Sequence, residues 1–278
     1  EGYPALAVLD STVPEAVHNL ESRLDLKRTL FIVASKSGTT TEPVMFHRYF
    51  YDRVKTGQNF IAITDPDTQL ARDAQRDRFR KVFLNPADIG GRYSALSKFG
   101  LVPAALSGVD VAEFLERAIH ASHISMIPAT RKNPAAHLGV ALGALAAAGR
   151  DKVTLITPAP LDTLGLWIEQ LVAESTGKEG KGILPVAGEP ALEAGAYGKD
   201  RVFVAVRLRK SNETQRLRDH IAAGHPVIDI VLEDTLDLGE TFFVWELATA
   251  MAGAVMGINP FDQPNVQESK DNTRRLLD

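Results

Sequence analysis

The stretch TLFIVASKSGTTTEP, residues 29–43, decides how the fold is interpreted. Residues 29–35 form a short, continuous apolar run, which is typical of a strand buried on both faces of a parallel sheet. The run passes into Ser, Lys, Gly and Thr residues, and a helix-like stretch begins near Pro43. In an open parallel sheet, ligands bind beyond the carboxyl ends of the strands. Residues 35–41 are therefore a candidate binding loop.

The same alternation of strand and helix extends along the chain. It indicates an α/β fold with two doubly wound, three-layer subdomains, residues 1–130 and 131–278, joined by a mostly helical middle between residue 94 and about 149. Residues 137–149 are apolar almost all round and predict a buried helix. The expected strands are 5–9, 29–35, 59–64, 81–84, 152–157, 201–208 and 226–232. The expected helices include 13–24, 43–55, 164–174, 213–223 and 240–256.

The composition is that of a globular protein and argues against several classes of protein and of metal site. A formal net charge of -4 without a long basic run argues against a nucleic-acid or membrane-surface partner. No apolar run reaches the roughly 18 residues of a membrane span. The chain has no cysteine, which excludes thiolate metal sites and fits a cytoplasmic location.

The residues of the candidate loop suit a phosphate group. Hydroxyls can donate hydrogen bonds to an anion, the start of the following helix favours negative charge, and Gly38 permits a tight turn. The alternative is an ordinary helix cap with spare hydroxyls. Neither the nucleotide P-loop pattern nor a dinucleotide-binding glycine pattern is present. The candidate phosphate ligands are Ser35, Lys36, Ser37, Thr39 and Thr40.

Four stretches carry a resemblance to a known family. SKSGTT, from Ser35, resembles the phosphate loop of sugar isomerase (SIS) domains. IGGRYSALSKFGLVPAALSG, ESTGKEGKG and NPFDQPNVQESK, at residues 89–108, 174–182 and 259–270, resemble segments of the phosphoglucose isomerase family. Residues 174–186 and 197–208 look most like the isomerase part of bifunctional transaldolase–phosphoglucose isomerases, although this sequence contains no transaldolase part.

The resemblance implies two SIS-type subdomains, a homodimer, and interconversion of glucose 6-phosphate and fructose 6-phosphate through an enediol, without a cofactor or metal. Glu174 matches the family's base, and Arg92 matches the arginine that faces the enediolate. Lys270 matches a lysine that assists ring opening, and Gln263 a glutamine that helps to hold the phosphate. Taken alone, these residues could also be a surface glutamate, a loop arginine paired with Asp88 and a solvated lysine.

Two departures from the family pattern are visible. The family has a glycine-rich loop with a phosphate-binding serine ahead of the first strand, and here only a few residues precede that strand. We expect the sequence to be a piece of a longer chain, and the alternative is that the first strand–helix unit was lost. The family also uses a histidine in ring opening, but residues 175–208 contain none. His220 is the best candidate, and a partly exposed helix histidine is the equally weighted alternative.

Two other functions stay open from the sequence. A sugar-phosphate-binding module without catalysis would keep the loop but would not need Glu174, Arg92 and Lys270 together. An isomerase that also acts on mannose 6-phosphate would pass through the same type of enediol, so the base cannot decide between the epimers.

Overall fold

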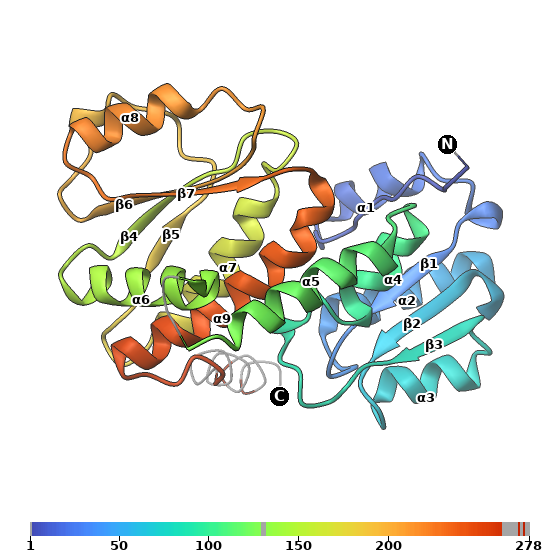
Figure 1. Ribbon diagram of the computed structural model, residues 1–278. Coiled ribbons are helices and arrows are strands. Elements are labelled where there is room, and N and C mark those ends of the chain that lie inside the picture. Colours follow the sequence, from blue (N-terminus) through green and yellow to red (C-terminus); the bar gives the residue numbers. More distant parts are fainter. Residues whose placement is uncertain (1, 129–131, 263–271, 273–274, 276–278) are drawn as a thin grey trace. The chain divides into compact units, whose positions relative to one another are not determined.

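The computed structural model describes residues 2–128 and 132–262, together with residues 272 and 275, and the chain forms two compact units (Figure 1). Unit 1 is Glu1–Val111 and unit 2 is Ala112–Asp278. The division comes earlier in the chain than the boundary at residue 130 that we expected.

Helix α5 (Val111–Ser125) explains the earlier boundary, because it packs with unit 2. A Cβ atom at Gly239 would lie only 2.1 Å from the Phe114 carbonyl oxygen, so only glycine allows this close approach. The Arg117 guanidinium donates hydrogen bonds to Asp234 and Asp237 at 2.6 and 2.7 Å. Backbone contact and charge pairing thus attach α5 to the second sheet's helices.

Unit 1 is built on a parallel sheet in the order β1-β2-β3. The register pairs Phe31 with Phe60 and Ile61 with Lys81. Short apolar strands of this kind need cover on both faces. The elements in chain order are α1 (Pro14–Glu21), β1 (Phe31–Ala34), α2 (Thr41–Val54), β2 (Phe60–Thr64), α3 (Gln69–Arg76), β3 (Lys81–Leu84) and α4 (Lys98–Leu106).

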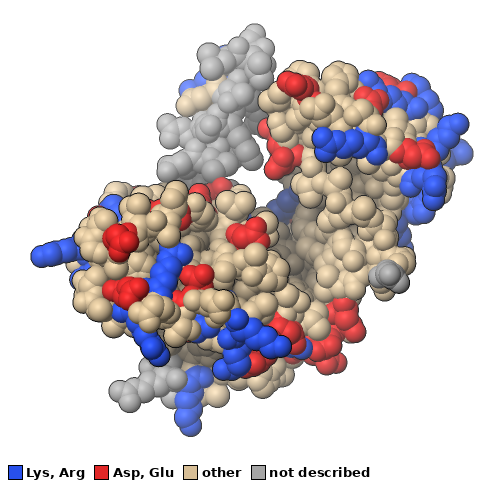
Figure 2. Space-filling view, turned by 90° about the horizontal axis from the view of Figure 1, so that it is seen from above, with Lys and Arg blue, Asp and Glu red and all other residues tan. Residues whose placement is uncertain are grey.

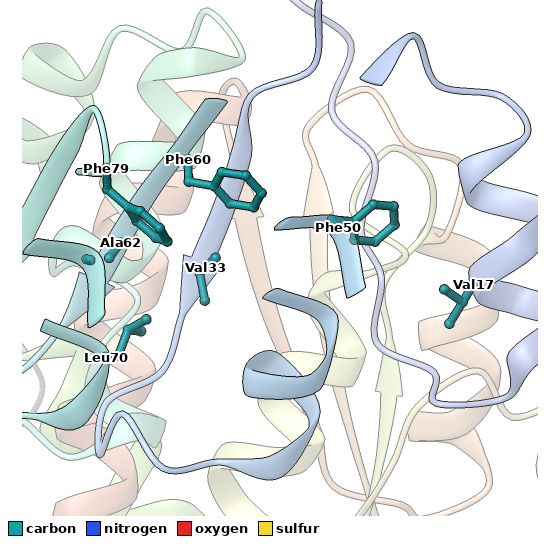
Figure 3. Close-up of a cluster of buried hydrophobic side chains, with 8 residues drawn as sticks. Val17, Val33, Phe50, Phe60, Ala62, Leu70 and Phe79 are labelled. Atoms are coloured by element: carbon teal, nitrogen blue, oxygen red, sulfur yellow. The ribbon is translucent and has the colours of Figure 1, made fainter. Parts of the chain in front are cut away.

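One face of this sheet packs on α1, α2 and α3 through a cluster of buried side chains (Figure 3). Phe60 is fully buried at its centre and stacks on Phe31 and Phe79, with ring centroids 4.9 and 5.2 Å apart. Aromatic pairs at this separation add to the free energy gained by burying their area. Helix α4 packs on β2 as well. The cluster holds β1 and β2 firmly, and therefore the loops that follow them.

The strand expected at residues 5–9 is not formed, and that prediction is wrong. The residues from Gly2 to Val13 have no regular secondary structure, and Leu6 and Val8 are 55% and 75% exposed. A strand exists only through pairing with a neighbour. An apolar run in a sequence does not show whether such a neighbour is there.

Unit 2 is built on a parallel sheet in the order β5-β4-β6-β7. Strand β5 was not expected from the sequence, because it is short and contains Pro185, which suits an edge position. The elements are α5, α6 (Pro134–Ala147), β4 (Lys152–Ile156), α7 (Leu164–Thr176), β5 (Leu184–Val186), β6 (Arg201–Leu208), α8 (Thr214–Ala222), β7 (Val227–Leu232) and α9 (Leu238–Met256).

Helices cover both faces of the second sheet, with α8 on one face and α6 and α9 on the other (Figure 1). Helices α6 and α9 pack so closely that a Cβ atom at Gly139 would lie 2.4 Å from the Ala248 carbonyl oxygen. The expected helix at residues 137–149 is confirmed within α6. It is not buried all round, since Val140 is 42% exposed while Leu138 and Leu142 are buried. The predicted three-layer α/β/α architecture is confirmed.

The surface carries both signs of charge, with acidic and basic side chains interspersed on the face that Figure 2 shows. None of the helices that the structure describes is long and apolar enough to cross a membrane.

Candidate functional site

The candidate phosphate loop of unit 1 joins the carboxyl end of β1 to the start of α2, as the sequence predicts. The buried Ser35 donates a hydrogen bond from its hydroxyl to the Thr40 hydroxyl at 3.0 Å. The Ser37 and Thr39 hydroxyls lie 3.1 Å apart, and the Thr39 amide donates to the Ser37 Oγ at 3.3 Å. Ser37, Thr39 and Thr40 are exposed, so the loop presents hydroxyls to solvent from a fixed base.

The first turn of α2 strengthens this loop as a place for an anion. Thr40 is the N-cap, yet its side chain makes no capping hydrogen bond to the described residues of α2. The amide groups of a first turn have no partner within their own helix. Pro43 lies in this turn, where its missing N–H is not needed. The remaining amides and the helix dipole favour a negatively charged group beside Thr40.

Gly38 is required by the fold rather than by the ligand. Its φ is +66°, and a Cβ atom there would lie 2.7 Å from Thr68 Cβ and 2.9 Å from the Leu70 amide nitrogen. The loop after β1 therefore approaches the start of α3 very closely. This approach fixes the height of the hydroxyl groups above the sheet.

Lys36 is placed differently from the phosphate ligand that the sequence suggested. Its ammonium contacts the Asp65 carboxylate and donates to the Ala87 carbonyl oxygen at 2.9 Å. Asp65 follows β2 and Ala87 follows β3, so this one side chain connects the ends of three strands. Its position gives no support to a direct role in holding phosphate.

Arg92 lies in the 3-10 turn Gly91–Tyr93 that follows β3, and it is 6% exposed. Its guanidinium carbon is 5.7 Å from the centre of the Tyr93 ring. A guanidinium does not lose its proton in proteins, so this group is a fixed positive charge. A Cβ atom at Gly91 would meet no described atom within 4 Å, so the backbone beside Arg92 is open to close approach. In unit 1, the hydroxyl loop and Arg92 thus both follow the carboxyl ends of strands.

Glu174 stands at the carboxyl end of α7 in unit 2 and is exposed. Gln170, one turn earlier, donates a hydrogen bond to its Oε1 at 3.2 Å. The next residues anchor the helix end, because the buried Thr176 donates to the Val172 carbonyl at 2.8 Å and accepts from the Ile183 amide at 2.9 Å. An accessible carboxylate is therefore held on a rigid helix end, as a general base requires.

Two lysines after Glu174, Lys178 and Lys181, attach the turn that follows α7 to the end of α9. These contacts were not expected from the sequence. Lys178 and Lys181 flank a tight turn and are paired through both backbone hydrogen bonds, at 3.1 and 2.9 Å. The buried Lys178 ammonium donates to the carbonyls of Asn259 and Asp262 at 2.7 and 2.9 Å. Lys181 donates to the Met256 carbonyl at 2.8 Å, at the end of α9. The turn after Glu174 is thereby attached to the segment that follows α9.

His220 lies in the core of unit 2, where a ring-opening histidine is not expected. It is 1% exposed, and its ring stacks on Phe203 at 3.8 Å between centroids. Burial, with help from Arg216, lowers the pKa of His220 below its usual value. Helix α8, which carries it, covers the opposite face of the sheet from α9, on which α7 packs. The burial of His220 gives no support to the predicted role in ring opening.

Two predicted site residues, Gln263 and Lys270, lie outside the residues that the structure describes. Within residues 2–128 and 132–262, no three His, Asp or Glu side chains are grouped so that they could hold a metal ion.

Comparison with known proteins identifies the family. The model of the family described as phosphoglucose isomerase matches residues 5–182, which include the hydroxyl loop, Arg92 and Glu174. The chain belongs to the phosphoglucose isomerase family. Membership confirms the family resemblance, and the SIS-type fold that it implied is confirmed as well.

Relatives in the phosphoglucose isomerase family are similar along most of the chain. A glucose-6-phosphate isomerase of Staphylococcus saprophyticus is 29% identical over 99% of this chain and 73% of its own length. One from Clostridium novyi is 29% identical over 88% of this chain and 65% of its own length. The chain therefore spans about two thirds to three quarters of the length of these relatives.

Solved structures show the same fold at lower identity. A hypothetical protein from Thermus thermophilus superimposes with a TM-score of 0.85 at 24% identity, covering 97% of this chain and 76% of that one. A glucose-6-phosphate isomerase from Chlamydia trachomatis gives a TM-score of 0.79 at 22% identity, covering 95% of this chain and 62% of that one.

Proposed function

We propose that the chain interconverts glucose 6-phosphate and fructose 6-phosphate by general acid–base catalysis through an enediol. The observation that carries the proposal is the family match over residues 5–182, since it covers the loop, the buried arginine and the exposed glutamate in one stretch. The curated relatives in the comparison carry the name glucose-6-phosphate isomerase.

Each residue has a chemical task in this proposal. Ser35, Ser37, Thr39 and Thr40, with the first-turn amides of α2, hold the phosphate, and Gln263 assists. The binding energy of the phosphate positions the sugar for reaction. Lys270 helps to open the ring.

The Glu174 carboxylate removes the proton from C2 of the open-chain aldose and returns it to C1. In the same sequence a proton reaches O1 and another leaves O2, so that aldose and ketose have the same composition. Arg92 stabilises the negative charge that develops on these oxygens, because its own charge is fixed and its site is shielded from water. A base and a stabilising cation are the two groups that a proton transfer next to a carbonyl requires.

We also propose a homodimer in the cytoplasm, with a transaldolase part fused to it in the native protein. The absence of cysteine fits a reducing compartment. The likeness of residues 174–186 and 197–208 to the bifunctional enzymes supports the fusion. Light scattering of the purified chain tests the dimer, and a mass of one chain would contradict it.

The deciding test is a coupled assay of fructose 6-phosphate conversion. We expect turnover by the wild type and its loss in Glu174→Gln, which removes the proton acceptor but keeps the size of the side chain. Glu179→Gln is the matched control, because Glu179 is an exposed glutamate in the turn that follows.

Equal turnover in wild type and Glu174→Gln would refute the assigned base. Phosphosugar binding without any turnover in the wild type would indicate a binding module instead of an enzyme. The same assay with mannose 6-phosphate decides the epimer.

A further inference from the structure

Lys36 is bound to the end of β2 by its main chain as well as by its side chain. Its carbonyl oxygen accepts hydrogen bonds from the Asp65 amide at 3.2 Å and the Thr64 hydroxyl at 3.3 Å. Its ammonium contacts the Asp65 carboxylate. The two residues therefore form a closed connection between the loop after β1 and the loop after β2.

The Asp65 carboxylate makes it costly for Lys36 to turn toward a phosphate. The Asp65 side chain is only 11% exposed, and its Oδ1 is buried without a hydrogen-bond partner among the described residues. If the ammonium moved away, a buried carboxylate would lose its counter-charge, which strongly destabilises a protein. The pair also presents little net charge to an incoming anion.

The second partner of the ammonium lies in the loop that carries Arg92. Ala87 is inside a turn in which the Ile89 amide donates to the Pro86 carbonyl at 3.3 Å. The turn leads directly into Gly90, whose carbonyl accepts from the Tyr93 amide at 3.0 Å around Arg92. The carbonyl of Ala87 is thus held from outside the loop by Lys36, a residue 51 positions earlier.

We propose that Lys36 is a positioning residue, which holds the loop from Ala87 to Arg92 against the phosphate loop and so sets the place of the Arg92 guanidinium. The phosphate itself is held by hydroxyls and by the amides of α2. This inference rests on the proposed function, because it assigns Arg92 to the enediolate. The loop after β1 would then have two roles: its hydroxyls hold the phosphate, and Lys36 positions Arg92.

The test compares kcat with phosphate affinity in the double variant Lys36→Met, Asp65→Asn. Changing both partners avoids an unpaired buried charge, so the variant is expected to fold. We expect kcat to fall by about tenfold or more, because a small displacement of a catalytic group is costly. The KM for fructose 6-phosphate and the Kd for inorganic phosphate, measured by calorimetry, should stay within about twofold of the wild-type values.

A single variant adds a rescue to this test. Lys36→Arg can reach both Asp65 and the Ala87 carbonyl, and should recover most of the lost kcat. If Lys36 were instead a phosphate ligand, the double variant would weaken phosphate binding by about tenfold with kcat preserved. That result would overturn the inference. Lys55→Met, at the exposed end of α2, is the unchanged control.

A second readout does not depend on turnover. Phenylglyoxal modifies accessible arginines, and mass spectrometry of the Arg92 peptide gives the rate of modification. Release of the loop should raise that rate in the double variant above the rate in wild type and Lys55→Met, and an unchanged rate would overturn the inference. If wild type shows no isomerisation, the proposed function fails, while the phenylglyoxal result still decides the role of Lys36.

Discussion

The candidate groups of unit 1 lie at the carboxyl ends of its strands, whereas Glu174 of unit 2 lies near the amino ends of its strands. In unit 1 the hydroxyl loop follows β1 and Arg92 follows β3, so both lie beyond carboxyl ends of strands. In unit 2 helix α7 connects the parallel strands β4 and β5, so its carboxyl end, with Glu174, lies at the amino edge of that sheet. The rule for ligand sites in parallel sheets therefore finds the first set and misses the second.

The corresponding loop of unit 2 has a different set of buried and exposed side chains. The loop between β4 and α7 contains Leu161, 2% exposed, and ends at Leu164, 6% exposed, where unit 1 has exposed hydroxyls. Two leucine side chains are thus buried at this position of unit 2, where unit 1 exposes the hydroxyls of Ser37 and Thr39. Similar strand–loop–helix units therefore present different side chains after the strand.

The largest effect is expected at the buried cation of unit 1. Arg92→Met removes the charge that we propose stabilises the enediolate, and kcat should then fall by about 10²–10³-fold with a much smaller change in KM. Steady-state kinetics measure this, with circular dichroism to verify the fold. A variant that keeps normal kcat would show that Arg92 has no part in the mechanism. The hydroxyl loop would then be the one group compared in unit 1.

The burial of Leu161 predicts that its truncation has a large effect on stability but none on phosphate binding. Leu161→Ala should lower the free energy of unfolding by about 2–4 kcal/mol, because it leaves a cavity. Urea denaturation measures the loss, and calorimetry should give an unchanged Kd for inorganic phosphate. Weaker phosphate binding in the folded variant would show that the loop of unit 2 also takes part.

A Cβ atom at Gly38 would destabilise the protein in two ways, by contact with Thr68 and Leu70 and by strain at a positive φ. A matched control can separate these two contributions. Gly38→Ala should destabilise the protein by about 2–3 kcal/mol, since the Cβ meets Thr68 and Leu70. Gly188→Ala is the matched control, with the same φ of +66° but no described atom within 4 Å of the added Cβ, and should cost only about 1 kcal/mol. Equal shifts in urea midpoint would show that the loops can move apart.

The smallest effect concerns one buried histidine in each unit. Burial lowers the pKa of His47 and of His220 below the usual 6.5, so the unfolded chain binds more protons at mildly acidic pH. Their contribution to stability is therefore complete above about pH 6.5 and is lost as the pH falls below it. Urea midpoints between pH 7 and pH 5 should fall less steeply in His220→Phe, and remain parallel to wild type in the exposed control His123→Gln. Parallel curves for His220→Phe would mean that this ring does not set the acid sensitivity.

Most of the fold could be predicted because apolar runs report buried strands directly. Strands β3 and β6 have the predicted bounds, and the other predicted strands that form differ by one or two residues at their ends. The failure at residues 5–9 arose because the sequence does not reveal a pairing partner. The loop from Ser35 could be found from residue type and strand position alone.

The partners of charged residues could not be found in this way. Lys36 and Asp65 are 29 positions apart, and Lys178 and Asp262 are 84 apart, so only the fold brings them together. Glu174 became a candidate base only through the family resemblance, because an exposed glutamate at a helix end has no distinguishing pattern. The burial of His220 was not expected from the sequence, because a polar residue in a helix can face the core when aromatic rings surround it.

In the proposed mechanism, unit 1 holds the phosphate and Glu174 of unit 2 only transfers the proton. Calorimetric titration of inorganic phosphate into wild type, Glu174→Gln and the double variant Ser37→Ala, Thr39→Val separates these two roles. We expect the loop variant to bind inorganic phosphate about tenfold more weakly, as two lost hydrogen bonds allow, while Glu174→Gln binds it like wild type. Unchanged affinity in the loop variant, or a comparable loss in Glu174→Gln, would contradict this division of roles.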